Sequence, residues 1–136
     1  MKEKIYKIFN TTLVLKTLSM PYHTNANGKI FGGWIVSKID IGGAILAKEI
    51  TGGNVVTVKI SKVIFLKPIE VGDLIHCYAQ PVKIGNSSIT IKVKVWIKKI
   101  CNPPIGKYYL STKATIVYVA INNQGKPRTI PLLSIL

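Results

Sequence analysis

Residues 31–50 read FGGWIVSKIDIGGAILAKEI, and this stretch decides which fold the rest of the chain can adopt. As a helix, 20 residues would be about 30 Å long. Apolar side chains recur on all sides of it instead of along one stripe, which is typical of a helix that is buried on most of its surface. A single long helix of this kind needs a surrounding layer, which the flanking segments must supply.

The flanking segments have the patterns of β-strands. Residues 5–18 predict a first strand, and a loop rich in turn formers follows at 21–28. After Gly52-Gly53, four further strands are predicted, at 54–66, 74–84, 88–98 and 107–121. In the first of these four, we expect one face to carry Val56, Val58, Ile60, Ile64 and Leu66. The order strand, long helix, four strands predicts an α+β fold in which a curved antiparallel β-sheet wraps around one long central helix.

Length and composition indicate one domain. The 136 residues are enough for one core but not for two. We expect a single domain over 1–136, with the core at about 8–124 and a short C-terminal tail at 125–136. The edges of such a sheet are usually covered by a second subunit, so we also expect a homo-oligomer.

The chain has no obvious membrane or export signal. The most apolar stretch is interrupted by charged residues, and no signal-peptide core follows the charged N-terminus. Cys77 and Cys101 lack the spacing of a disulfide framework or a zinc site. We therefore expect a cytoplasmic protein with no membrane partner, no metal and no cofactor.

The formal net charge of +14 first suggests a nucleic-acid-binding module. However, Arg128 is the only arginine, whereas base recognition favours arginine, and the lysines are spread along the chain. We interpret most lysines as a solvated surface and expect no nucleic-acid partner. A small molecule that carries several phosphates remains compatible with a subset of them.

Asp40 is the acidic residue that stands out. The chain contains only five acids: Glu3, Asp40, Glu49, Glu70 and Asp73. Glu70 and Asp73 flank Gly72 in a predicted turn, where a solvated turn role is the ordinary interpretation. Asp40 lies in the middle of the helix, where Asp has poor propensity and burial is costly without a partner. A structural Asp bonded to nearby backbone is one alternative, and we favour a catalytic carboxylate that faces a pocket.

Other groups capable of chemistry are few. His76 is next to Cys77, but neighbouring strand residues point to opposite faces, so direct pairing is not expected. His23 has the setting of an ordinary turn residue. Gly32-Gly33 at the helix start would let a ligand reach free N–H groups and could stabilise an oxyanion, although close packing explains two glycines equally well. Gly42-Gly43 are expected to serve packing.

Several motifs in series carry a resemblance that spans about residues 13–131. These are TNANG at 24–28, IFGGW at 30–34, IDIGGAILAKEI at 39–50, VVTV at 55–58, FLKPIEVGD at 65–73, VWIKK at 95–99 and VAINNQGKPRTIP at 119–131. The chain resembles the small bacterial acyl-CoA thioester hydrolases of the hot-dog superfamily, the YciA group.

The resemblance implies a hot-dog fold, acyl-CoA substrates, no metal, and a homo-oligomer with the dimer as the minimal active unit, commonly a hexamer. It implies an active site at the dimer interface, with a helix Asp that matches Asp40 and a loop Asn that matches Asn25. It also implies that backbone at Gly32-Gly33 holds the thioester carbonyl. The loop reads Tyr22-His23 before TNANG, where relatives often carry an acid.

Substrate-binding candidates beyond these are Thr57, Ser88, Lys98 and Lys99. Thr57 is expected to line the pocket, and the other three are candidates to meet the phosphates of coenzyme A. The alternative functions are a non-catalytic acyl-CoA binder or dehydratase of the same fold, for which His23 is the only loop histidine, and the basic nucleic-acid-binding module.

Overall fold

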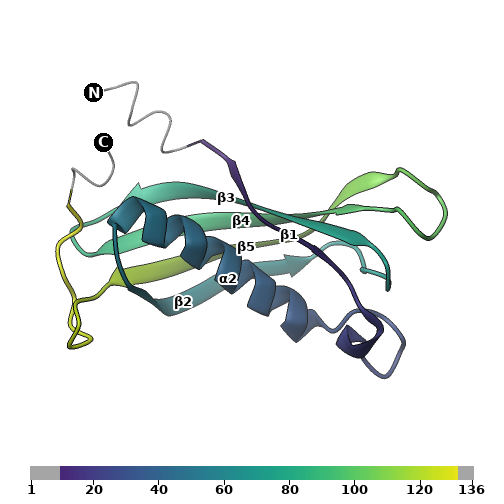
Figure 1. Ribbon diagram of the computed structural model, residues 1–136, viewed down its shortest axis with the longest axis horizontal. Helices are drawn as coiled ribbons and strands as arrows, with labels where there is room; N and C mark the ends of the chain where they lie inside the picture. Colours follow the sequence, from purple (N-terminus) through teal and green to yellow (C-terminus); the bar gives the residue numbers. More distant parts are fainter. Residues whose placement is uncertain (1–9, 132–136) are drawn as a thin grey trace.

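The computed structural model describes residues 10–131. One long helix packs against one face of a five-stranded sheet (Figure 1). The elements in chain order are β1 (Thr12–Leu18), the short 3₁₀ helix η1 (Pro21–His23), α2 (Gly32–Thr51), β2 (Val55–Phe65), β3 (Leu74–Ile84), β4 (Ser88–Lys98) and β5 (Tyr108–Ala120). Neighbouring strands are antiparallel, in the order β1-β3-β4-β5-β2. The predicted α+β architecture is confirmed, while residues 5–9 of the predicted first strand lie outside the described part.

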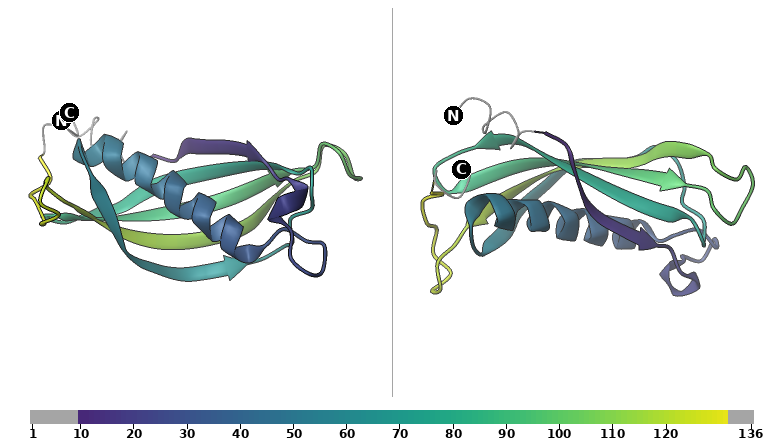
Figure 2. Two further views of the ribbon diagram at one scale, coloured as in Figure 1. Left: turned by 60° about the horizontal axis from the view of Figure 1, so that its bottom comes forward. Right: turned by 45° about the horizontal axis from the view of Figure 1, so that its top comes forward.

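The core lies between α2 and the inner face of the three central strands. Strand β4 alternates strictly, with its apolar residues buried and its polar residues turned the other way. Its buried side chains are Ile89, Ile91, Val93, Val95 and Ile97. Among the described elements, only α2 covers a face of the sheet, and the opposite face carries no helix (Figure 2).

Glycines in α2 let the helix lie close to the sheet, as predicted. A Cβ atom on Gly43 would overlap the hydroxyl of Tyr118, which is fully buried in β5. A Cβ atom on Gly42 would have Val14 Cγ2 as its nearest neighbour, at 3.1 Å, and would otherwise meet only ordinary contacts at 3.6 Å or more. The helix ends at Gly52, whose φ of 73° is the left-handed conformation that glycine adopts most easily.

Strand β2 departs from the predicted alternation because it contains two bulges. The register with β5 shifts after Thr57 and again after Ser61. Each shift changes which side chains face inward. Ile60 therefore lies opposite the buried Ile116, whereas Val56 is on the other face. The prediction of a single apolar face is wrong for the following set: Val56, Val58, Ile60, Ile64 and Leu66.

Strand β2 is also an apolar edge strand. Five of its large side chains are more than a third exposed, namely Val56, Val58, Ile60, Ile64 and Phe65. On the exposed side of α2, Ile41 is 48% exposed. An edge with unpaired backbone groups and exposed apolar side chains is a surface that a second chain can cover.

Substituting the two packing glycines separately tests the helix–sheet contact. We expect Gly43→Ala to lower the free energy of unfolding by about 1–3 kcal/mol, because the methyl group displaces a fixed tyrosine. Gly42→Ala is the matched control, because it brings the same gain in helix propensity, about 1 kcal/mol, while its one tight contact is with a movable valine methyl group. Urea unfolding followed by circular dichroism measures both. Equal stability of the two variants would contradict the contact.

Candidate active site

Asp40 lies in the middle of α2 and faces β2 and β5. The Thr57 hydroxyl donates a hydrogen bond to Asp40 Oδ1 at 2.7 Å. The Tyr118 hydroxyl donates to the main-chain oxygen of Asp40 at 2.7 Å and lies 3.3 Å from Oδ1. Burial, and then the negative charge of Asp40, raise the pKa of Tyr118, so this phenol stays protonated and remains a donor. Two strands therefore fix the orientation of one half-buried carboxylate.

The two oxygens of the Asp40 carboxylate have different surroundings. Oδ1 accepts the hydrogen bond from Thr57, whereas no described residue donates a hydrogen bond to Oδ2. A carboxylate with one oxygen held and the other open can take a proton from water or attack a carbonyl carbon. The alternative of a purely structural Asp explains the bond at Oδ1 but gives Oδ2 no role.

Asn25 is placed in the loop before α2. Its side-chain Oδ1 accepts hydrogen bonds from the N–H groups of Asn27 at 2.9 Å and Lys29 at 3.2 Å. This is the local turn in which asparagine bonds to the backbone that follows it. The bonds fix the direction of the side chain and leave its Nδ2 group without a partner among the described residues. Asn25 is thus held as a potential donor.

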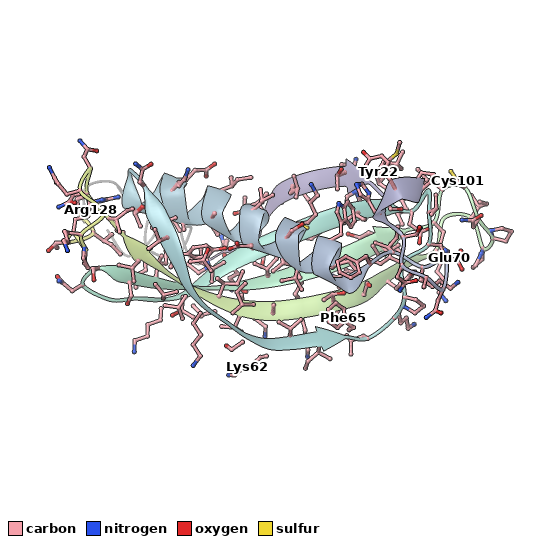
Figure 3. All side chains as sticks on the ribbon, turned by 90° about the horizontal axis from the view of Figure 1, so that it is seen from below. Tyr22, Lys62, Phe65, Glu70, Cys101 and Arg128 are labelled. Atoms are coloured by element: carbon pink, nitrogen blue, oxygen red, sulfur yellow. The ribbon has the colours of Figure 1, made fainter. Side chains whose placement is uncertain are left out.

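The start of α2 lies beside Asn25. Asn25, Gly32 and Phe65 line one hollow of about 310 Å³. Figure 3 shows Phe65 on β2 at this end of the molecule. The helix has no side-chain cap, so the N–H groups of Gly32 and Gly33 are the unbonded donors that a helix start exposes. The hollow is therefore lined by one residue with an amide donor, Asn25, and one with a main-chain donor, Gly32, and Gly33 follows on the helix.

One chain does not bring all these groups together. Gly33 and Asp40 are seven positions apart on the same helix, which separates them by about 10 Å along its axis. The structure therefore contains two partial sites. Asp40 and Thr57 form one of them, and Asn25 with Gly32-Gly33 forms the other.

The three candidates for phosphate contacts lie elsewhere. Ser88 pairs with Val119, next to the inward Ile89, so it faces away from Asp40. Lys98 is exposed at the far end of the same strand, β4. Neither approaches Asp40 within one chain.

Lys99 is a structural residue, and its assignment to phosphates is corrected. Its ammonium is buried and bonds to Glu70 Oε2 at 2.9 Å and Asp73 Oδ1 at 3.1 Å. Burial opposes the charge, but the two carboxylates outweigh burial and raise the pKa of Lys99. Asp73 is fully buried, so its interpretation as a solvated turn residue is also wrong.

Other candidate groups do not assemble into a site. Cys77 is buried on the inner face, and burial raises the pKa of its thiol to about 12. His76 faces the other way, toward Tyr108, as the strand pattern predicted. His23 stacks on Trp34 with ring centres 4.2 Å apart and accepts a bond from the Met20 N–H. No group of His, Cys, Asp and Glu suited to a metal occurs within residues 10–131.

Tyr118 is the site residue that the sequence did not single out. Strand alternation indicates its inward direction, but nothing local identifies a contact with a helix 78 positions away. The described part of the chain also contains no helix long and apolar enough to cross a membrane.

Comparison with known proteins identifies relatives that match most of the chain. Residues 27–100 match the family described as "Thioesterase superfamily". The acyl-CoA thioester hydrolase YciA of Salmonella typhimurium is 56% identical over 88% of this chain and 90% of its own.

Solved structures agree. The hexameric thioesterase y2039 of Yersinia pestis is 55% identical, with a TM-score of 0.85 over 90% of this chain and 97% of its own. A hexameric broad-specificity acyl-coenzyme A thioesterase is 57% identical, with a TM-score of 0.84 over 88% of this chain and 81% of its own. The chain belongs to the thioesterase superfamily and, within it, to the YciA-type group of hot-dog proteins.

Proposed function

We propose that this protein hydrolyses the thioester of acyl-coenzyme A, with Asp40 as the catalytic carboxylate. Two of the relatives named above, YciA and the broad-specificity enzyme, are acyl-CoA thioesterases at more than 50% identity over 88% of this chain. The observation that carries the role of Asp40 is its half-buried carboxylate, which Thr57 holds at Oδ1 and which is open at Oδ2. Two unpaired cysteines fit the reducing cytoplasm, which we propose as its location.

The proposed active unit is a dimer, which assembles further into a hexamer as in the related structures. The apolar edge strand β2 and the exposed Ile41 offer the surface for pairing. Since Asp40 and the start of α2 are about 10 Å apart in one chain, a complete site needs groups from two chains. We propose that Asp40 of one subunit faces Asn25 and Gly32-Gly33 of the other.

In this arrangement, the thioester carbonyl accepts hydrogen bonds from the N–H groups at Gly32-Gly33, and the Asn25 amide orients the carbonyl or the water. Asp40 takes a proton from water, hydroxide adds to the carbonyl carbon, and the C–S bond breaks as the thiolate of coenzyme A takes a proton. Alternatively, Asp40 attacks the carbonyl carbon itself, the C–S bond breaks to give a mixed anhydride, and the thiolate of coenzyme A leaves and takes a proton from solvent. Water then hydrolyses the anhydride to the free acid and restores the Asp40 carboxylate. General base action supplies about 10²–10⁴-fold and one oxyanion donor about 10²–10³-fold.

The first test removes the charge of Asp40 with little change of shape. We expect Asp40→Asn to lower the rate of thiol release from acyl-CoA by about 10²-fold or more, because the amide cannot accept the proton. A thiol reagent measures the rate, and size-exclusion chromatography checks the assembly. Glu49→Gln, at an exposed position in the last turns of the same helix, is the matched control. Full activity of Asp40→Asn would refute the catalytic role of Asp40, whereas no thiol release from the unaltered protein would leave an acyl-CoA binder.

Mixing two inactive variants tests whether the site is shared. Asn25→Ala alone should be strongly impaired, like Asp40→Asn. In a dimer that contains one chain of each kind, one of the two sites keeps both intact residues. Random pairing of equal amounts makes half of the dimers mixed, so the co-expressed preparation should regain about a quarter of wild-type activity. Activity that stays at the level of the separate variants would place Asp40 and Asn25 in a site within one chain.

Thr57 is proposed as a positioning residue. Thr57→Val removes the hydrogen bond to Oδ1, and we expect kcat to fall about tenfold, the effect of losing one hydrogen bond to a charged group. KM should change little. Thr57→Ser keeps the donor and should restore most of kcat. A serine variant as slow as the valine variant would show that packing, not the hydroxyl, matters.

A further inference from the structure

The outer face of the sheet contains a second, basic hollow. It measures about 450 Å³, within the range of about 300–1,000 Å³ that is usual for small-molecule sites. Its lining includes Lys62, Lys83, Lys92 and Lys113, each from a different strand, together with Thr90, Thr115, Ile64 and Val82. This face is the one that α2 does not cover (Figure 2). We define this set of residues as the basic hollow.

Strand register places these positive charges on one surface. Lys83 pairs with Thr90 across β3 and β4, and Lys92 pairs with Thr115 across β4 and β5. Lys113 is directly opposite Lys94, another lysine. Like charges in directly opposite positions destabilise an antiparallel pair. The sheet thus gathers charges that repel one another.

No described carboxylate neutralises the basic hollow. Asp40 bonds to Thr57 on the helix side of the sheet, and Glu49 is in the last turns of α2. Glu70 and Asp73 bond to Lys99 in the loop before β3. The ion pairs found within residues 10–131 involve only two lysines, and neither of them lines the hollow.

The backbone conformation at Lys62 orients its side chain toward the basic hollow. Lys62 has a φ of 54°, the only non-glycine residue of the described chain in the left-handed region. It lies within the second bulge of β2 (Figure 3). A strained conformation at a bulge re-aims a side chain and persists where the surroundings require it. Here the side chain that it places lines the basic hollow.

We propose that the basic hollow binds a small anion with several phosphate groups, at a site separate from the acyl-CoA site. The four ammonium groups supply the charge, and the hydroxyls of Thr90 and Thr115 can donate hydrogen bonds to phosphate oxygens. Ile64 and Val82 give the hollow an apolar rim that an organic group can contact. The sheet lies between the basic hollow and Asp40, so a ligand bound in the hollow cannot also contact Asp40 of the same chain. The proposal does not depend on the proposed hydrolase activity.

Binding of inorganic tripolyphosphate to the intact oligomer tests the proposal. Isothermal titration calorimetry at low salt should give a dissociation constant that rises at least tenfold in the double variant Lys92→Gln/Lys113→Gln. The control is Lys48→Gln/Lys126→Gln, which removes the same charge from exposed positions outside the hollow and should change binding less than twofold. Equal weakening in both double variants would show general attraction to a basic protein and overturn the site.

Two further measurements separate this site from the substrate site. The KM for acyl-CoA should be unchanged in Lys92→Gln/Lys113→Gln. A large rise in KM would assign these lysines to substrate and overturn a separate site. A nucleoside triphosphate that binds more tightly than tripolyphosphate would place its organic part on the apolar rim. Equal affinity would identify the phosphates alone as the ligand.

Discussion

The hydrogen bond from the Tyr118 hydroxyl to the main-chain oxygen of Asp40 is the contact on which the rest of the site depends. It can form only because Gly43 has no side chain and the helix can lie against the tyrosine. The bond fixes the position of α2 relative to β5 at the level of Asp40. Thr57 can then reach Oδ1, and the open oxygen keeps a constant direction. The close packing of α2 against β5 therefore also determines the orientation of the Asp40 carboxylate.

The geometry of a helix explains why the function needs more than one chain. A 20-residue helix presents its N–H donors at the start and Asp40 well along its length. A thioester carbonyl cannot contact both in the same subunit. An apolar edge strand beside the carboxylate, with a half-exposed isoleucine on the helix, provides a place where the missing donors can be supplied by a second copy. The same surface thus serves both subunit pairing and catalysis.

The sequence predicted the fold well where regular patterns dominate. The helix was expected at 31–50 and is found at Gly32–Thr51, and β4 has the predicted bounds because its alternation is strict. The sequence-based prediction of one apolar face failed for β2, because bulges interrupt the alternation there. A bulge depends on pairing with β5 and not on local composition. For the site, the sequence singled out Asp40 and Thr57, which a hydrogen bond joins in the structure. Tyr118, by contrast, is a long-range contact without a local signal.

The shortage of acidic residues connects the remaining features. Two of the four described acids hold Lys99 at the end of the sheet, where Glu70 also bonds to Lys29. Asp40 bonds to Thr57 on the helix side of the sheet, and Glu49 is exposed in the last turns of α2. None is left for the outer face of the sheet, where lysines stand opposite threonine or another lysine. A solvated surface of mixed charge would have interspersed acids there, so the absence of described acids on this face favours an external anion as the partner of these lysines.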